Sequence, residues 1–134
     1  GGTNSATPSY SSYTIGKISM IKAVELLDHE FDDIKFTILG PGWVKTKIHQ
    51  STLETKHKPY ENFNKTLKML TNPELCNPIE KVIDDIYKLI DLPKSLVGGR
   101  NFSSVHDSLD KNKLRSLYNK NVDFYKLRRN LNDA

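Results

Sequence analysis

The stretch KFTILGPGWVKT, residues 35–46, decides how this sequence is interpreted. Its first five residues, 35–39, contain the β-branched and aromatic side chains that favour a strand. The Gly-Pro-Gly segment at residues 40–42 then ends the strand, because glycine and proline favour turns. A loop at the carboxyl end of a parallel strand is where open α/β sheets bind ligands. We therefore expect a binding turn directly after this strand.

Helical patterns lie on both sides of this strand. Apolar residues recur every three or four positions over residues 13–31 and again after residue 78. The second helix has a marked start, since Asn77 can cap it, Pro78 suits its first turn and Glu80 occupies the capping-box position. We expect these helices to pack their apolar faces on the sheet.

A second strand is expected within residues 95–103, followed by a polar helix over about 110–120. Residues 47–77 are predicted to form a long, irregular loop with one short helix at about 62–70. Because helices alternate with strands, the fold class is α/β with a parallel sheet. Two parallel strands do not make a stable sheet by themselves, so the architecture is expected to be incomplete.

Composition excludes several classes of protein. The 134 residues fit one domain, and no run of apolar residues is long enough for a transmembrane helix or a signal peptide. The net charge of +4 comes from scattered residues and does not call for nucleic acid. The single cysteine suits a reducing cytoplasm, and the four histidines show no metal-ligand spacing, so no metal site is predicted.

Tyr13 and Lys17 are candidates for proton transfer. They lie four residues apart at the start of the first predicted helix, which puts both on one face with the ammonium near the phenol oxygen. A phenol ordinarily has a pKa near 10, and a cation beside it favours the phenolate. The pair can therefore act as a general acid/base. The alternative is an exposed helix start without chemistry.

Taken in order, SYTIGK at residues 12–17, the strand, and PGWVKT at residues 41–46 resemble the short-chain dehydrogenase/reductase family. The Val-Gly-Gly-Arg segment at residues 97–100 resembles the family's last strand. The resemblance implies a doubly wound, Rossmann-type sheet. It also implies hydride transfer between NAD or NADP and a small-molecule carbonyl or alcohol.

The resemblance also implies roles for particular residues. Tyr13 matches the catalytic tyrosine, and Lys17 matches the lysine that activates it and binds the nicotinamide ribose. Cofactor contacts are implied for Tyr13, Lys17, Pro41, Gly42, Val44 and Thr46. Trp43 and His49 are candidates for substrate contact, with a packed tryptophan and a solvated loop histidine as the alternatives.

The sequence also departs from the family pattern. It has no glycine-rich cofactor turn and no residue that would choose NAD or NADP, and the catalytic serine would lie before Gly1. We therefore interpret residues 1–134 as the carboxyl-terminal half of one dehydrogenase domain, with the amino-terminal nucleotide-binding half missing. Its segments are 13–31 (catalytic helix), 35–46 (strand and cofactor turn), 47–77 (substrate loop), 78–103 (helix and last strand) and 104–134 (tail).

This interpretation leads to expectations about activity and assembly. The 134 residues alone should be inactive, and they should expose a strand edge and an apolar helix face. A homodimer or homotetramer is expected, with neither a nucleic acid nor a membrane as partner. A sugar-nucleotide epimerase or dehydratase is the first alternative, although the Pro-Gly-x-Val-x-Thr turn favours a reductase. A non-catalytic binding protein that kept the fold is the second.

Overall fold

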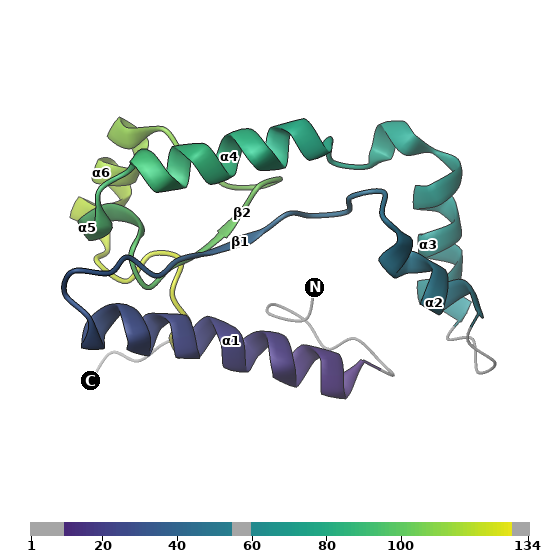
Figure 1. Ribbon diagram of the computed structural model, residues 1–134, viewed down its shortest axis with the longest axis horizontal. Helices are drawn as coiled ribbons and strands as arrows, with labels where there is room; N and C mark the ends of the chain where they lie inside the picture. The colour runs from purple at the N-terminus through teal and green to yellow at the C-terminus, as the bar shows by residue number, and fades with distance from the viewer. Residues whose placement is uncertain (1–9, 55–59, 130–134) are drawn as a thin grey trace.

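The computed structural model describes residues 10–54 and 60–129 (Figure 1). Its sheet has two parallel strands, β1 (Ile38–Gly40) and β2 (Asn101–Ser103), with Leu39 opposite Phe102. The expected parallel pairing is confirmed. The described residues form a mixed α/β structure that is mostly helical, and its sheet has these two strands alone.

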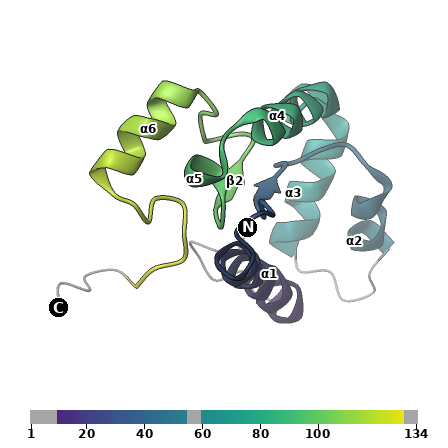
Figure 2. The same ribbon diagram turned by 60° about the vertical axis from the view of Figure 1, so that its left-hand side comes forward.

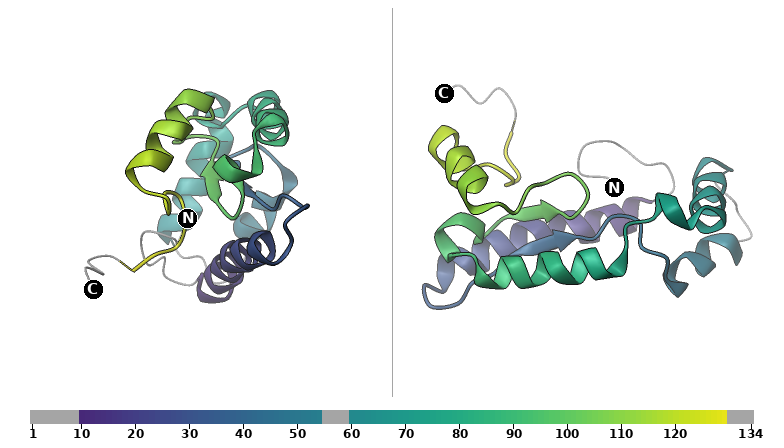
Figure 3. Two further views of the ribbon diagram at one scale, coloured as in Figure 1. Left: turned by 90° about the vertical axis from the view of Figure 1, so that its left-hand side faces the viewer. Right: turned by 90° about the horizontal axis from the view of Figure 1, so that it is seen from above.

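Two long helices cover the two faces of this sheet. Helix α1 (Ser11–Glu30) lies on one face and α4 (Ile79–Asp91) on the other (Figures 1 and 3). The chain then forms α5 (Lys94–Val97), β2 and α6 (Lys111–Lys120). Helix α6 packs against α5, away from α2 and α3 (Figure 2). Asp110 starts α6 as its N-cap, accepting hydrogen bonds from the N–H groups of two first-turn residues.

The segment between β1 and α4 is more regular than the sequence predicted. It contains η1 (Lys47–His49), α2 (Gln50–Glu54), α3 (Tyr60–Thr71) and η2 (Pro73–Leu75), while residues 55–59 lie outside the described part. Helix α2 packs against α3. The described part of residues 47–77, which was expected to be mostly an irregular loop, therefore consists largely of short helices. Helix α3 is covered by α2, which comes from the same segment of the chain.

The apolar stripe of α1 is only partly covered. Ile21 is buried and Val24 is half-buried, as helical periodicity predicted, but Ile15 is 65% exposed. The purple first half of α1 runs past the end of the strands in Figure 1, so no sheet lies beneath it there. The helix itself extends from Ser11 to Glu30, close to the expected range of 13–31.

The hydrophobic core lies where α4 ends. Its most buried side chains are Val97, Phe102 and Leu114, from α5, β2 and α6. The same cluster also contains Leu89, Leu92, Leu96 and Phe124. Burying side chains of this size contributes roughly 1.5–3 kcal/mol each, so this cluster is the main source of stability among the described residues.

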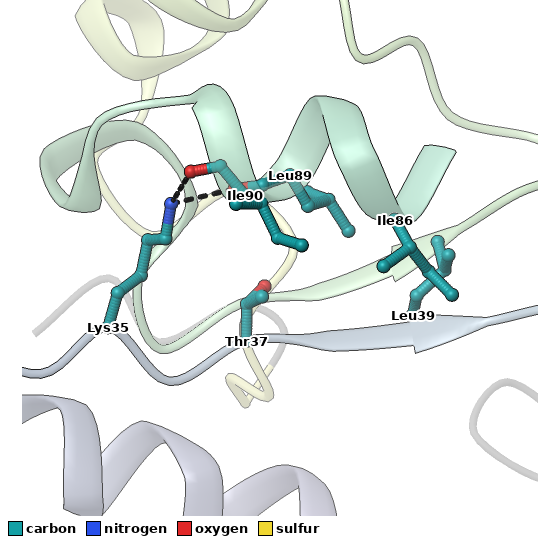
Figure 4. Close-up of a pocket in the computed structure, with 6 residues that line it drawn as sticks. All are labelled: Lys35, Thr37, Leu39, Ile86, Leu89 and Ile90. Carbon is teal, nitrogen blue, oxygen red and sulfur yellow. Dashed lines mark hydrogen bonds between the residues drawn. The ribbon is translucent and has the colours of Figure 1, made fainter. Parts of the chain in front are cut away.

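Two lysines bind the carboxyl ends of the long helices. Lys94 Nζ donates to the carbonyl oxygens of Asp28 (2.7 Å), Phe31 and Ile34 (2.7 Å). Lys35 Nζ donates to those of Leu89 (2.8 Å) and Ile90 (2.6 Å) (Figure 4) and to that of Leu92 (2.7 Å). The last carbonyls of a helix have no hydrogen-bond donor within it and lie at the negative end of its dipole. An ammonium group there supplies both a donor and a favourable positive charge.

Arg100 joins the last described segment to the sheet. It is almost fully buried and donates from Nη1 to the carbonyl of Phe124 (2.7 Å) and from Nη2 to that of Val122 (2.9 Å). Its guanidinium also lies 4.0 Å from the Phe124 ring centroid, and burial lowers the pKa of Arg100. Within residues 10–54 and 60–129, no helix has both the length and the apolar character needed to span a bilayer.

Candidate functional site

The candidate residues gather at one end of the molecule, which we call the open end (residues 10–20, 41–46 and 77–81). Both strands finish there, and α1 and α4 begin there (Figures 1 and 3). Ligands of open α/β sheets bind outside the carboxyl ends of the strands. The open end is therefore the place in this fold where a site is expected.

Tyr13 and Lys17 contact each other on the first turns of α1. Lys17 Nζ lies 5.4 Å from the centroid of the Tyr13 ring, and Tyr13 is 53% exposed. The ring of Tyr10 packs edge-on against Tyr13, with centroids 6.0 Å apart. The four-residue spacing brings the two side chains together, as expected, but no hydrogen bond among the described residues joins the ammonium to the phenol oxygen. The ammonium lies against the ring, an arrangement in which it is attracted to the aromatic face.

The turn after β1 needs glycine at position 42 for two reasons. Gly42 has φ +75°, the left-handed region in which a side chain is strained. A Cβ built there would also collide with Cγ2 of Val105. The backbone of the turn therefore passes close to the segment after β2, and Gly42 is the residue that allows it.

Asn77 binds this turn at two points. Its side-chain Nδ2 donates to the carbonyl of Pro41 (2.7 Å), and its backbone N–H donates to the carbonyl of Trp43 (2.6 Å). The expectation that Asn77 caps the next helix is wrong, since Pro78 is the N-cap of α4 and makes no side-chain capping bond. The amide is directed at the turn instead, because the turn and the start of α4 are adjacent in space.

A buried polar cluster lies behind Asn77. Its Nδ2 also donates to Ser104 Oγ (3.0 Å), and that hydroxyl donates to Asp85 Oδ2 (2.6 Å). Lys81 Nζ donates to the same carboxylate oxygen (2.7 Å) and to the backbone carbonyl of Ser104. Burial by itself raises the pKa of Asp85, but the hydrogen bonds from Lys81 and Ser104 outweigh it, and the pKa is lowered. No spacing in the sequence indicated this cluster.

Trp43 and His49 are stacked. Their ring centroids are 4.6 Å apart with an interplanar angle of 19°, and both side chains are half-buried. His49 Nε2 lies 3.0 Å from the carbonyl oxygen of Val44, which fixes Nε2 as the donor. The two candidates for substrate contact thus form one aromatic surface next to the turn.

The remaining predicted residues are placed less tightly. Val44 is half-buried, and Thr46 is exposed. Among the described residues, no hydrogen bond or ring contact joins Tyr13 or Lys17 to the turn. The Tyr13–Lys17 pair and the turn with its stacked Trp43 and His49 are therefore two separate groups, and both lie at the open end.

An apolar groove lies elsewhere. It measures about 310 Å³ and lies between β1 and α4, lined by Lys35, Thr37, Leu39, Ile86, Leu89 and Ile90 (Figure 4). The Lys35 ammonium is already bound to helix carbonyls. The groove therefore offers an apolar surface on the face of the sheet and is distinct from the strand ends.

A row of large apolar side chains on α4 continues from this groove. They are about half exposed and comprise Ile79, Ile83, Ile86, Tyr87 and Ile90. The apolar face predicted for this helix is thus divided, since Val82 and Leu89 are buried while this row is uncovered.

No group of three or more potential metal ligands occurs within the part of the chain that the structure describes. No protein-family model, curated protein or solved structure matches the chain.

Proposed function

We propose that this chain supplies the acid/base half of an NAD(P)-dependent oxidoreductase that resembles the short-chain dehydrogenases. The intact enzyme would act on a small-molecule carbonyl or alcohol. The observation that carries the proposal is the contact of Lys17 with Tyr13 at the end of the fold where a Gly42 turn follows a parallel strand. A positioned acid/base and a ligand-binding turn at one end of a sheet are what such a reaction requires.

The residues divide the chemistry between them. NAD or NADP, when bound, supplies or accepts the hydride. The Tyr13 hydroxyl gives its proton to the carbonyl oxygen in reduction and takes it back in oxidation. The Lys17 ammonium stabilises the phenolate that remains after the proton has left. Trp43 and His49 provide a flat surface against which a substrate can pack.

The turn suits the nicotinamide side of such a cofactor. The N–H groups of Gly42 and Val44 have no acceptor among the described residues, and backbone donors of this kind can bind a carboxamide. By contrast, the 134 residues contain no glycine-rich turn for the pyrophosphate. The proposal therefore assigns the dinucleotide part to another segment of the enzyme.

The uncovered apolar surfaces support this division. The half-exposed row on α4 and Ile15 on α1 would be covered once more sheet and its neighbours were present. We propose a homodimer or homotetramer for the intact enzyme.

The first test uses the full-length protein that contains this chain. Oxidation of NADH and NADPH is followed with a panel of aldehydes and ketones, and Tyr13→Phe is expected to lower kcat by about 10²–10⁴-fold. Tyr10→Phe is the matched control, because it keeps the ring contact with Tyr13 and removes a hydroxyl without a proposed role. Full reductase activity in Tyr13→Phe would refute the catalytic assignment.

The second test uses the 134 residues alone. Calorimetric titration with NADH and NADPH is expected to show no binding at micromolar concentration, since the chain lacks a pyrophosphate site. Micromolar binding would contradict the division into two halves.

A further inference from the structure

Asn77 controls the orientation of two peptide units in the turn. It donates to the carbonyl oxygens of Pro41 and Trp43 from its side chain and backbone, respectively. In a trans peptide the C=O and the following N–H point in opposite directions. The N–H groups of Gly42 and Val44 are therefore directed away from Asn77.

The cluster behind Asn77 fixes which way its amide faces. The Asp85 carboxylate can only accept, so the Ser104 hydroxyl must donate to it. The Ser104 oxygen is then left to accept, and the group that Asn77 presents to it must be the NH₂. Both amide protons are thereby used, one on Ser104 and one on Pro41. Lys81 keeps Asp85 charged and so completes the arrangement.

We propose that Asn77 is a positioning residue for cofactor binding, held in place by Ser104, Asp85 and Lys81. It directs the N–H groups of Gly42 and Val44 toward the nicotinamide end of the cofactor. This inference rests on the proposed function. It differs from a role in helix capping, because the bonds of the Asn77 side chain go to Pro41 and Ser104, outside α4.

The test compares Asn77→Asp with Asn72→Asp in the full-length protein. A carboxylate at position 77 has the shape of the amide but cannot donate to Pro41, so the Pro41–Gly42 peptide is released while the backbone bond to Trp43 remains. We expect the KM for the nicotinamide cofactor to rise about tenfold, equivalent to ~1.4 kcal/mol, while kcat at saturating cofactor changes less than about twofold, as expected when uniform binding is lost. Asn72 is the matched control, since its amide bonds only to Lys68 and Thr71 beside it.

A second variant, Ser104→Ala, keeps the Asn77 donors but removes the hydroxyl that orients them. It is expected to raise the cofactor KM by less than Asn77→Asp does. A purely structural role would instead lower kcat together with Tm and leave KM unchanged, and that result would overturn the inference. If the wild-type protein turns over no cofactor, the proposed function itself fails. If it does and Asn77→Asp has the wild-type KM, the inference alone fails.

Discussion

The two ends of the molecule are held together by different kinds of interaction. At the closed end (residues 28–35 and 89–100), two lysine ammonium groups bind six carbonyls at and just beyond the ends of α1 and α4, and the buried cluster around Val97 packs beside them. At the open end, Tyr13 and Ile15 are exposed, and the turn is held by Asn77 and the polar groups behind it. Apolar packing adds to the lysine hydrogen bonds at the closed end, whereas hydrogen bonds from Asn77 hold the turn at the open end.

Because of this difference, we expect the residues that determine stability and those that take part in the proposed chemistry to lie at opposite ends of the molecule. Substitutions at the closed end should lower the free energy of unfolding without selective effects on ligand binding. Substitutions at the open end should change ligand binding with smaller effects on unfolding. Functional residues on a rigid support typically show this division.

The largest effect on stability is expected from Leu114→Ala. Leu114 is fully buried in the cluster at the closed end, and truncating a buried leucine costs about 2–5 kcal/mol through lost burial and the cavity left behind. Urea denaturation measures the change. Leu67→Ala on the half-exposed side of α3 is the control, with an expected cost below about 1 kcal/mol. Equal losses in the two variants would show that the core is not concentrated at the closed end.

Lys94→Met should have the next largest effect. Methionine keeps the length of the side chain but removes the donor from the carbonyls of Asp28, Phe31 and Ile34, at and just after the end of α1. Hydrogen bonds from a charged group are worth about 1.5–3 kcal/mol, and the partial exposure of Lys94 puts the expected loss toward the lower figure. Lys22→Met removes only an exposed ion pair with Glu25 and should cost less than about 1 kcal/mol. If both variants unfold at the same urea concentration, the lysine contact does not stabilise the end of α1.

Local patterns in the sequence predicted a good part of this fold. The helix periodicity over 13–31 and the polar helix expected over about 110–120 depend on neighbours in the chain, and each corresponds to an element in the structure. The strand expected over 35–39 is found as the shorter β1, Ile38–Gly40. The parallel pairing followed from the alternation of helices and strands. The Tyr13–Lys17 contact likewise follows from helix geometry alone.

Long-range partners could not be predicted in this way. Asn77 fits a helix-cap motif, yet its amide binds Pro41 and Ser104, which are 36 and 27 residues away in the chain. Periodicity identified Ile15 as part of an apolar stripe but does not say what covers that stripe. The short helix expected at about 62–70 corresponds to α3, but the sequence did not indicate α2, which packs against it from the same segment.

Gly42→Ala tests the turn at the open end. A left-handed backbone costs an L-residue about 1–2 kcal/mol, and the new methyl group would also displace Val105. We expect a modest loss of stability with a clear rise in cofactor KM in the full-length protein. Gly16→Ala is the opposite control: it lies within α1 with open space around it, and should gain about 0.5–1 kcal/mol. An unchanged KM in Gly42→Ala would remove the turn from the proposed site.

The smallest effect is a pH dependence that comes from Asp85, which supports the open end through Ser104 and Asn77. The hydrogen bonds from Lys81 and Ser104 lower the folded-state pKa of Asp85 below its ordinary value. The charged carboxylate therefore stabilises the fold fully above the unfolded-state pKa, near 4. That contribution is lost as the pH falls through the lower folded-state pKa. Asp85→Asn should consequently show a flatter fall of Tm than the wild type from about pH 5 downward.

Asp123→Asn provides the comparison from another part of the molecule. The pKa of Asp123 is also lowered, chiefly by its hydrogen bond with Arg128, but the carboxylate is part of the last described segment. Both variants should flatten the Tm curve in acid, whereas only Asp85→Asn should speed hydrogen exchange at the Asn77 backbone amide, which is bonded to the Trp43 carbonyl. Protonation of Asp85 weakens the hold of Ser104 on Asn77, and so on the turn. If the Asn77 amide exchanges alike in both variants, the polar cluster does not hold the open end.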